Sequence, residues 1–230
     1  MSAFALKIIG CITMLLCHIP FVFPELSIPL IYIGKIAFPI YAFLISEGYI
    51  HTKKFSKYLV RLIIFAIISQ VPAYLLFVGH FSKFYFNIFF TLMAGLFGIR
   101  IYDKIKNKFI SVPLMFLIAV LAQVLGFDYG AIGVFMIVTF FIFKESKVKM
   151  TLIEILLMFI FYLEKSTHYS YTIANIRYLL FQLLFSISSL LFVAFYNGKR
   201  GKNTKRIQIA FYCFYPVHLT LLVILKYFIH

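Results

Sequence analysis

Two histidines have the clearest capacity for chemistry in this sequence. His18 and His218 lie in apolar stretches near opposite ends of the chain, each past the middle of its stretch. An unperturbed imidazole titrates at about pH 6.5, so two imidazoles that meet can move a proton at neutral pH. The alternative for each ring is structural, with one N–H donated to a carbonyl of a neighbouring helix.

Lys35, Glu47 and Asp128 are charged side chains that stand in or directly beside apolar stretches. Lys35 precedes a proline-containing segment, Asp128 follows an apolar stretch, and Glu47 stands four residues before His51. Residues four apart share one face of a helix, so Glu47 and His51 are expected to pair. Two interpretations of this pair stay open: a structural ion pair, which Arg61 can join, or the lining of a polar entrance from the cytoplasm.

The composition indicates that the elements around these residues lie in a membrane. Of the 230 residues, 63% are hydrophobic and only 13% are charged, too few charges to cover a soluble globule of this length. A formal net charge of +15 would indicate nucleic acid in a soluble protein, but here we expect the bilayer and no nucleic acid as partner. The three cysteines stand in apolar runs without metal-ligand spacing, so we expect no metal site.

The apolar stretches predict an all-α, polytopic helix bundle. A span needs about 20 apolar residues to cross about 30 Å of hydrocarbon. Charged and turn-forming residues divide the chain into nine candidate spans, at 5–23, 28–50, 59–78, 87–102, 110–126, 130–143, 150–163, 176–196 and 207–228. The fifth to seventh are short, and we expect them to tilt or to be partly re-entrant. These spans predict a single integral membrane domain over residues 1–230.

Basic residues are concentrated in alternate connections. Seventeen of the 22 basic residues are Lys7 and those in the segments 51–61, 100–108, 144–149 and 197–206. The other five lie elsewhere in the chain. Cytoplasmic loops of membrane proteins carry such an excess. The pattern therefore predicts a cytoplasmic N-terminus and an extracytoplasmic C-terminus.

Eight short blocks of sequence also carry a resemblance to a known family. They cover residues 6–18, 34–39, 47–52, 57–62, 87–92, 128–133, 196–201 and 214–218. In this order the blocks resemble the TraX family, named for the protein that N-acetylates F-pilin. The chain is also distantly similar to the acyltransferase-three group of membrane O-acyltransferases, which has a His in its first span, a basic residue before an aromatic-Pro stretch in the second and a Tyr-x-x-His element in the last.

The TraX resemblance implies a multi-pass acetyltransferase of the bacterial cytoplasmic membrane. Such an enzyme uses acetyl-CoA as donor, and the family is linked to pilin acetylation and conjugation. In the acyltransferase-three pattern, His18 is the residue thought essential to acyl transfer, and Lys35 stands where an Arg is usual. Family members often have an Asp before the first-span His, where this chain has Cys17. Either Asp128 supplies that carboxylate, or the mechanism does not need it.

Acetyl transfer requires a general base, donors for the tetrahedral oxyanion and a site for the phosphates of CoA. We expect His18 to be the base, tuned by His218 or Asp128. The residues expected to stabilise the oxyanion or to contact the acceptor are Lys35, Asn87, Thr91 and Tyr129. All of these lie near the predicted outer face.

The phosphates of CoA are expected to bind basic side chains on the cytoplasmic side. The candidates are Arg61, Arg100, Asn197, Lys199, Arg200 and Lys202. Two glycines in the segment 197–201 let the backbone approach a ligand. The alternative for each basic residue is that it only sets the topology.

Two other functions stay open. In a proton-coupled transporter, His18, Glu47, Asp128 and His218 would form a proton relay, although the chain has no internal repeat. In a non-enzymatic membrane assembly factor for a secreted polymer, none of them would be catalytic. The identity of the acceptor also stays open, with a peptide or pilin N-terminus and an envelope glycan as the candidates. Whether the protein forms a homodimer stays open too.

Overall fold

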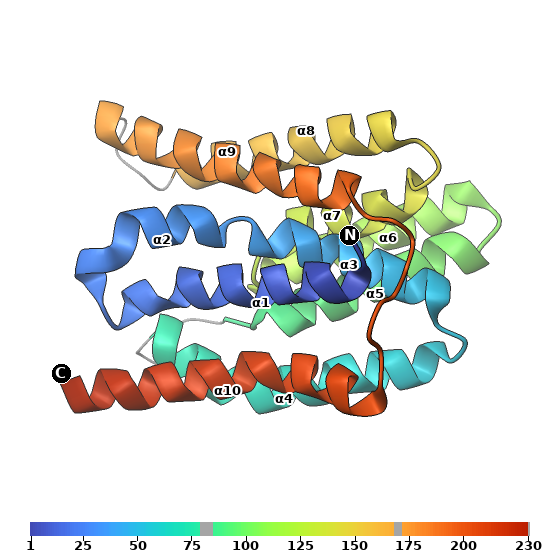
Figure 1. Cartoon of the computed structure of the whole chain (residues 1–230). Coiled ribbons are helices and arrows are strands. Elements are labelled where there is room, and N and C mark those ends of the chain that lie inside the picture. The colour runs from blue at the N-terminus through green and yellow to red at the C-terminus, as the bar shows by residue number, and fades with distance from the viewer. Residues whose placement is uncertain (79–84, 168–171, 230) are drawn as a thin grey trace. The chain divides into compact units, whose positions relative to one another are not determined.

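The apolar stretches of the chain form helices, as the sequence predicts. The computed structural model describes residues 1–78, 85–167 and 172–229, and Figure 1 shows its helices. Their bounds are Ala3–His18 (α1), Ser27–Gly34 (α2), Ala37–His51 (α3), Phe55–Phe77 (α4), Ile88–Lys104 (α5), Lys108–Val124 (α6), Gly130–Ile142 (α7), Lys147–Ser166 (α8), Ile173–Ala194 (α9) and Lys205–Ile229 (α10), with 3-10 turns at Ile19–Phe21 (η1) and Pro24–Leu26 (η2). This confirms the predicted all-α membrane bundle.

Five stretches of the described chain are long and apolar enough to cross a membrane. They are Ala3–Phe21, Pro24–His51, Phe55–Phe77, Ile173–Ala194 and Lys205–Ile229, which correspond to the first three and the last two predicted spans. The other four predicted spans are the helices α5 to α8. Of these, α7 has 13 residues and so rises about 20 Å, less than the roughly 30 Å of hydrocarbon. For these four helices a full crossing stays a prediction.

The second predicted span is divided into two helices. Helix α2 ends at Gly34 and α3 begins at Ala37, and 3-10-type hydrogen bonds from Lys35 to Tyr32 (3.1 Å) and from Ile36 to Ile33 (3.2 Å) close the end of α2. Pro39 falls in the first turn of α3, where its missing N–H is not needed. The break places Lys35 at a helix end.

The chain divides into two compact units. The first comprises residues 1–41 and 146–230, and the second comprises residues 42–145. The first therefore holds α1, α2 and α8 to α10, and the second holds most of α3 together with α4 to α7. The expectation of a single domain over residues 1–230 stays a prediction.

In the first unit, α1 packs against α2 and α10, and α9 packs against α2 and α8 (Figure 1). The closest helix contact is between α1 and α2. A Cβ added to Gly34 would lie 2.2 Å from the Cβ of Cys17 and 2.7 Å from its Cα. Only glycine fits this distance, and the contact brings the next residues, His18 and Lys35, to neighbouring positions.

The connection between α9 and α10 is held against the start of α1. Three backbone hydrogen bonds of 2.9 to 3.1 Å join them, from Asn197 to Met1, from Ala3 to Lys199 and from Phe4 to Arg200. The first N–H groups of α1, which have no partner inside the helix, are satisfied in this way. The basic segment 197–202 therefore has a defined backbone at the end of the unit opposite to η1 and η2.

In the second unit, α5 packs against α4, α6 and α7. Small residues allow the contact of α5 with α7, since a Cβ on Gly95 would meet Ile137 at 2.5 Å and one on Gly98 would meet Val138 at 3.0 Å. A bridge between Phe86 and Phe127 joins the residues before α5 to the connection between α6 and α7. This bridge positions Asp128 beside the start of α5.

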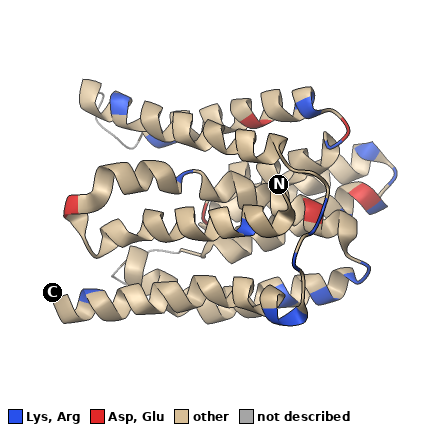
Figure 2. Ribbon diagram, viewed as in Figure 1, with Lys and Arg blue, Asp and Glu red and all other residues tan. Residues whose placement is uncertain are grey.

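Basic residues gather at one end of each unit taken by itself. In the first unit, Figure 2 shows Lys and Arg at the starts of α8 and α10 and in the connection before α10. In the second, they lie at the start of α4, the end of α5 and the start of α6. This is the distribution that the sequence predicts for cytoplasmic ends. The orientation in the membrane stays a prediction.

Gly34→Ala should destabilise the protein. A glycine to alanine change in an exposed helix interior stabilises by about 1 kcal/mol, whereas overpacking a tight contact costs about 1 to 3 kcal/mol. Because the added methyl would overlap Cys17, we expect a lower melting temperature by circular dichroism in detergent. The control is Ile28→Ala, at an exposed position of the same helix. An unchanged or raised melting temperature for Gly34→Ala would contradict the close contact.

Candidate functional site

The structure brings the two predicted histidines together. His18 is the last residue of α1, His218 lies on α10, and Nδ1 of His18 is 2.8 Å from Nε2 of His218. The ring planes differ by 6° and the centroids are 5.1 Å apart. Because a hydrogen bond joins the two ring edges, the rings meet edge to edge. Both residues belong to the first unit.

A backbone carbonyl sets the direction of this hydrogen bond. Nδ1 of His218 is 2.7 Å from the carbonyl oxygen of Phe214, which can only accept, so Nδ1 of His218 carries the hydrogen. In neutral His218, Nε2 is then an acceptor, and Nδ1 of His18 must donate to it. Nε2 of neutral His18 therefore bears the lone pair, and this atom has the chemistry of a general base.

The residues before His218 hold its ring in place. The ring of Phe214 lies 4.8 Å from that of His218, tilted by 30°. The ring of Tyr215 is edge-on to both histidines, with centroids 6.1 Å from His18 and 5.6 Å from His218. His218 is buried and His18 is half-buried. The segment 214–218 thus supplies the hydrogen-bond acceptor and the aromatic walls of one histidine.

Lys35 is the third predicted catalytic residue that the structure places near this pair. It follows Gly34, which contacts Cys17, the residue before His18. Its side chain is half-buried. The first unit therefore combines a hydrogen-bonded imidazole pair with a nearby ammonium group.

The fourth predicted catalytic residue, Asp128, lies in the second unit. Its N–H donates to the carbonyl of Phe86 at 2.9 Å, and its own carbonyl accepts the hydroxyl of Thr91. Tyr129 follows with φ of 62°, in the left-handed region, at the start of α7. These contacts hold Asp128, Thr91 and Tyr129 together. A role of Asp128 toward His18 stays a prediction.

Asn87 forms the N-terminal cap of α5. Its amide nitrogen donates to the carbonyl of Ala66 and to Oε1 of Gln70, both at 2.8 Å, and its Oδ1 accepts the N–H of Phe89 at 3.0 Å. Both amide hydrogens and the amide oxygen are thus used inside the protein, and Asn87 is fully buried. The geometry favours a structural role, which an Asn directly before a helix indicates by itself. A role of Asn87 toward an acceptor stays a prediction.

The basic candidates are divided between the units. In the first, Asn197, Lys199, Arg200 and Lys202 are exposed, and Oδ1 of Asn197 accepts the N–H of Lys199 at 3.1 Å in a tight turn. In the second, the guanidinium of Arg100 lies 5.1 Å from the ring centroid of Phe55, and Nε of Arg61 donates to the carbonyl of Lys57 at 3.1 Å. The segment 197–202 gathers four of the six candidates.

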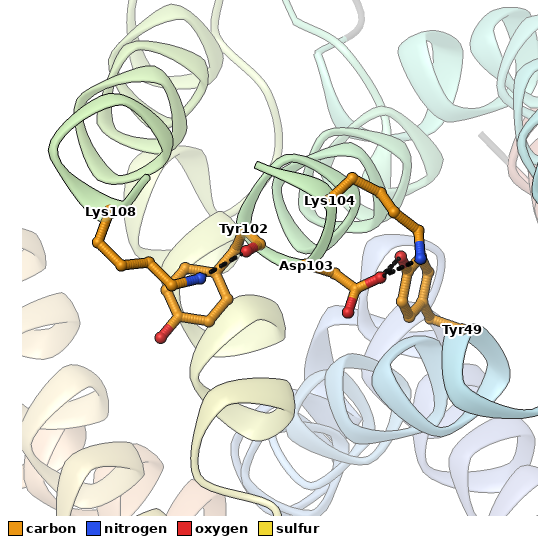
Figure 3. A network of polar contacts seen from close by, with 5 residues as sticks. All are labelled: Tyr49, Tyr102, Asp103, Lys104 and Lys108. Carbon is orange, nitrogen blue, oxygen red and sulfur yellow. Dashed lines mark hydrogen bonds and ion pairs between the residues drawn. The ribbon is translucent and has the colours of Figure 1, made fainter. Parts of the chain in front are cut away.

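Asp103 is a polar residue that the sequence reasoning missed. Figure 3 shows its Oδ2, which accepts a hydrogen bond from the hydroxyl of Tyr49 at 2.7 Å and lies 2.9 Å from the ammonium of Lys104. Asp103 follows the predicted span 87–102. Partial burial would raise the pKa of its carboxyl, but hydrogen bonds from Lys104 and Tyr49 and the charges of Lys104 and Arg100 hold that pKa below its usual range.

The predicted pair of Glu47 and His51 is present in the same unit. Oε2 of Glu47 is 3.4 Å from Nε2 of His51, one helical turn away on α3. His51 is exposed and Glu47 is half-buried. This geometry agrees with a structural ion pair at a helix end, and lining of an entrance stays a prediction.

Comparisons with known proteins agree with the sequence resemblance. A family model described as TraX protein matches residues 2–226. A probable fimbrial assembly protein FimC, serogroup H1, from Dichelobacter nodosus is 28% identical over 242 residues, which cover 99% of this chain and 97% of that protein. No solved structure matches the chain. The similarity to the acyltransferase-three group stays a prediction.

The hydrogen-bond direction predicts one tautomer for both histidines. At about pH 8, where an ordinary imidazole is neutral, His18 and His218 should each carry hydrogen on Nδ1 and a lone pair on Nε2. Solid-state ¹⁵N spectra of histidine-labelled protein in lipid distinguish the two tautomers. Spectra of His18→Asn and His218→Asn assign the signals by their loss. Hydrogen on Nε2 of His18 in the wild type would contradict the deduced direction.

Proposed function

Because the chain belongs to the TraX protein family, we propose that it is a membrane-embedded acetyltransferase. In this proposal an acetyl group passes from acetyl-CoA on the cytoplasmic side to an amine or hydroxyl of an acceptor on the other side of the bacterial cytoplasmic membrane. The similarity to a fimbrial assembly protein supports a pilus subunit as one acceptor class. An envelope glycan is the other.

The observation that carries the proposal is the hydrogen-bonded pair of His18 and His218. A base that acts on an amine or hydroxyl needs a lone pair and a way to stabilise the charge that it gains. Nε2 of His18 has the lone pair, and the hydrogen bond from its Nδ1 to Nε2 of His218 stabilises the imidazolium. Positioned acid–base catalysis of this kind contributes about 10² to 10⁴ in rate.

The reaction follows from this arrangement. Nε2 of His18 takes the proton from the acceptor as its nitrogen or oxygen attacks the carbonyl carbon of the thioester. The tetrahedral oxyanion that forms is stabilised by a positive charge, for which Lys35 is the candidate. The intermediate then collapses, the bond from carbon to sulfur breaks, and the departing thiolate takes the proton back from His18. The imidazole is regenerated neutral.

The proposed site for the phosphates of the donor is the segment 197–202. Lys199, Arg200 and Lys202 are exposed there, and hydrogen bonds to Met1, Ala3 and Phe4 order the backbone. Phosphate favours Lys and Arg. From Ala3 to His18 the helix α1 rises about 22 Å, which is the distance that the flexible arm of the donor has to span.

The same histidine pair would also serve a proton-coupled transporter. Such a protein would move protons into vesicles without acetyl-CoA, and a non-enzymatic assembly factor would do neither. The similarity to a fimbrial assembly protein fits the latter as well as an enzyme. Acetyl transfer that depends on His18 would distinguish the enzyme from both of these.

His18→Asn should abolish acetyl transfer while preserving the fold. The amide of Asn can still donate toward His218, but it provides no base. With radiolabelled acetyl-CoA, membranes and extract from the same cells, we expect transfer to fall by about 10² or more. Cys213→Ala, a half-buried position on α10, is the control for expression and folding. Equal transfer by His18→Asn and wild type, or none by the wild type, would remove the catalytic proposal.

Combined Lys199→Ala and Arg200→Ala changes should weaken the binding of acetyl-CoA. Each charged hydrogen bond to phosphate contributes about 1.5 kcal/mol or more, so the KM for acetyl-CoA should rise at least about tenfold with kcat little changed. Lys147→Ala, which removes an exposed basic residue at the start of α8, is the matched control. A KM that stays at the wild-type value, or that changes equally in the control, would contradict a phosphate site at these residues.

A further inference from the structure

An apolar groove reaches His218, the α10 member of the histidine pair. It has a volume of about 580 Å³ and lies between the end of α1 with the two 3-10 turns and one face of α10. Its walls include Leu15, Ile19 and Phe23 on one side and Val217, Leu221 and Leu225 on the other. His218 contributes the one nitrogen-bearing side chain among the residues that line it. The groove therefore joins a hydrocarbon surface to the proposed catalytic pair.

The groove extends from the depth of the histidines away from the basic segment 197–202. Along α10, which starts at Lys205 beside that segment, the lining residues run from Phe214 to Leu225. Along the other wall they run from Leu15, before His18, to Leu26 in the second 3-10 turn. The groove thus occupies the half of the first unit that the proposed donor phosphates do not approach.

The length of the groove matches a lipid chain. From Phe214 to Leu225 a helix rises about 16 Å, which is about half of the roughly 30 Å of hydrocarbon in a bilayer. One leaflet contributes that half, so the groove is as long as one extended chain of a membrane lipid. An acetyl group, with three non-hydrogen atoms, needs a small fraction of this space.

The wall of the groove on α10 is accessible from the membrane. Val217 is 54% exposed, Leu221 56% and Leu225 44%. Lipid tails are as apolar as leucine, so a chain gains little free energy from moving out of the lipid into the groove. The benefit of binding in the groove is the position of the polar head. A chain confined beside α10 holds the head at the depth of His18, so less entropy is lost when the head reaches the reactive geometry.

We propose that the acceptor is an amphiphile with a single long hydrocarbon chain. The chain lies in the groove between α1 and α10, and the amine or hydroxyl of the head lies at Nε2 of His18. The acceptor thus enters laterally from the lipid, while the donor enters from the end of the unit that carries the segment 197–202. This inference rests on the proposed acetyltransferase function, and it replaces the pilus subunit and the envelope glycan named there with a membrane amphiphile as the acceptor class.

The test uses primary alkylamines from ethylamine to hexadecylamine as acceptors, with radiolabelled acetyl-CoA and the full chain in lipid vesicles. Transfer should rise with chain length and level off when the chain fills the groove. Val217→Trp with Leu221→Trp fills the groove and should lower transfer to hexadecylamine at least about tenfold more than it lowers transfer to ethylamine. The matched control is Leu180→Trp with Leu184→Trp, two positions on α9 that are each 51% exposed.

A binding measurement separates this inference from the proposed function. A hexadecylamine that carries a diazirine in its chain should crosslink to the segment 214–225 in the wild type and equally in His18→Asn, and the groove-filling variant should lose the crosslink. If excess hexadecylamine does not reduce the crosslinking, the probe contacts the segment only as bulk lipid does, and the inference is overturned. Transfer that is independent of chain length and of the groove variant would overturn it while the acetyltransferase stands. Specific crosslinking without transfer to any acceptor would instead overturn the acetyltransferase.

Discussion

The hydrocarbon core of a membrane cannot form hydrogen bonds, so each polar group placed in it must find its partner inside the protein. The backbone of this chain meets the requirement by forming helices wherever the sequence is apolar. Several polar side chains meet it in pairs and clusters. Asn87 bonds to Gln70 and Ala66, Thr91 bonds to the carbonyl of Asp128, and His18 bonds to His218. The positions of the candidate residues follow from this constraint.

The same constraint gives the histidine pair its chemistry. A carbonyl that can only accept determines which nitrogen of His218 carries hydrogen, and this in turn determines the nitrogen on which His18 can take a proton. A single structural histidine would donate one hydrogen bond to a helix carbonyl and would need no second histidine. The pair instead forms a directed chain, with a basic atom at one end and a fixed acceptor at the other. Such an arrangement suits proton abstraction more than packing.

Around the pair, the first unit has a polar end and an apolar end. The basic segment 197–202 is ordered against the start of α1, and the apolar groove extends from His218 toward the end of α10. A charged, water-soluble donor suits the first surface, and a hydrocarbon chain suits the second. The close contact of Gly34 with Cys17 keeps α2, and with it Lys35, against the helix that carries His18.

The sequence by itself determined the helical membrane fold, the family and the two histidines. Hydrophobicity is a local property, and a His in an apolar stretch is conspicuous without any structure. Each histidine lies past the middle of its stretch, and the first and the ninth predicted spans run in the same direction, so similar depths could be predicted as well. The role of Asn87 as a helix cap could have been read from its place before the helix.

Other features were decided by the tertiary structure, because they depend on distances between residues far apart in the chain. These are the direction of the hydrogen bond between the histidines, the contact of Gly34 with Cys17, the pairing of Tyr49 with Asp103 and the groove beside α10. The lengths of the middle helices belong here too, since α7 has only 13 residues and crosses less than the bilayer. Periodicity and composition locate helices along the chain, but only packing decides which of their faces meet.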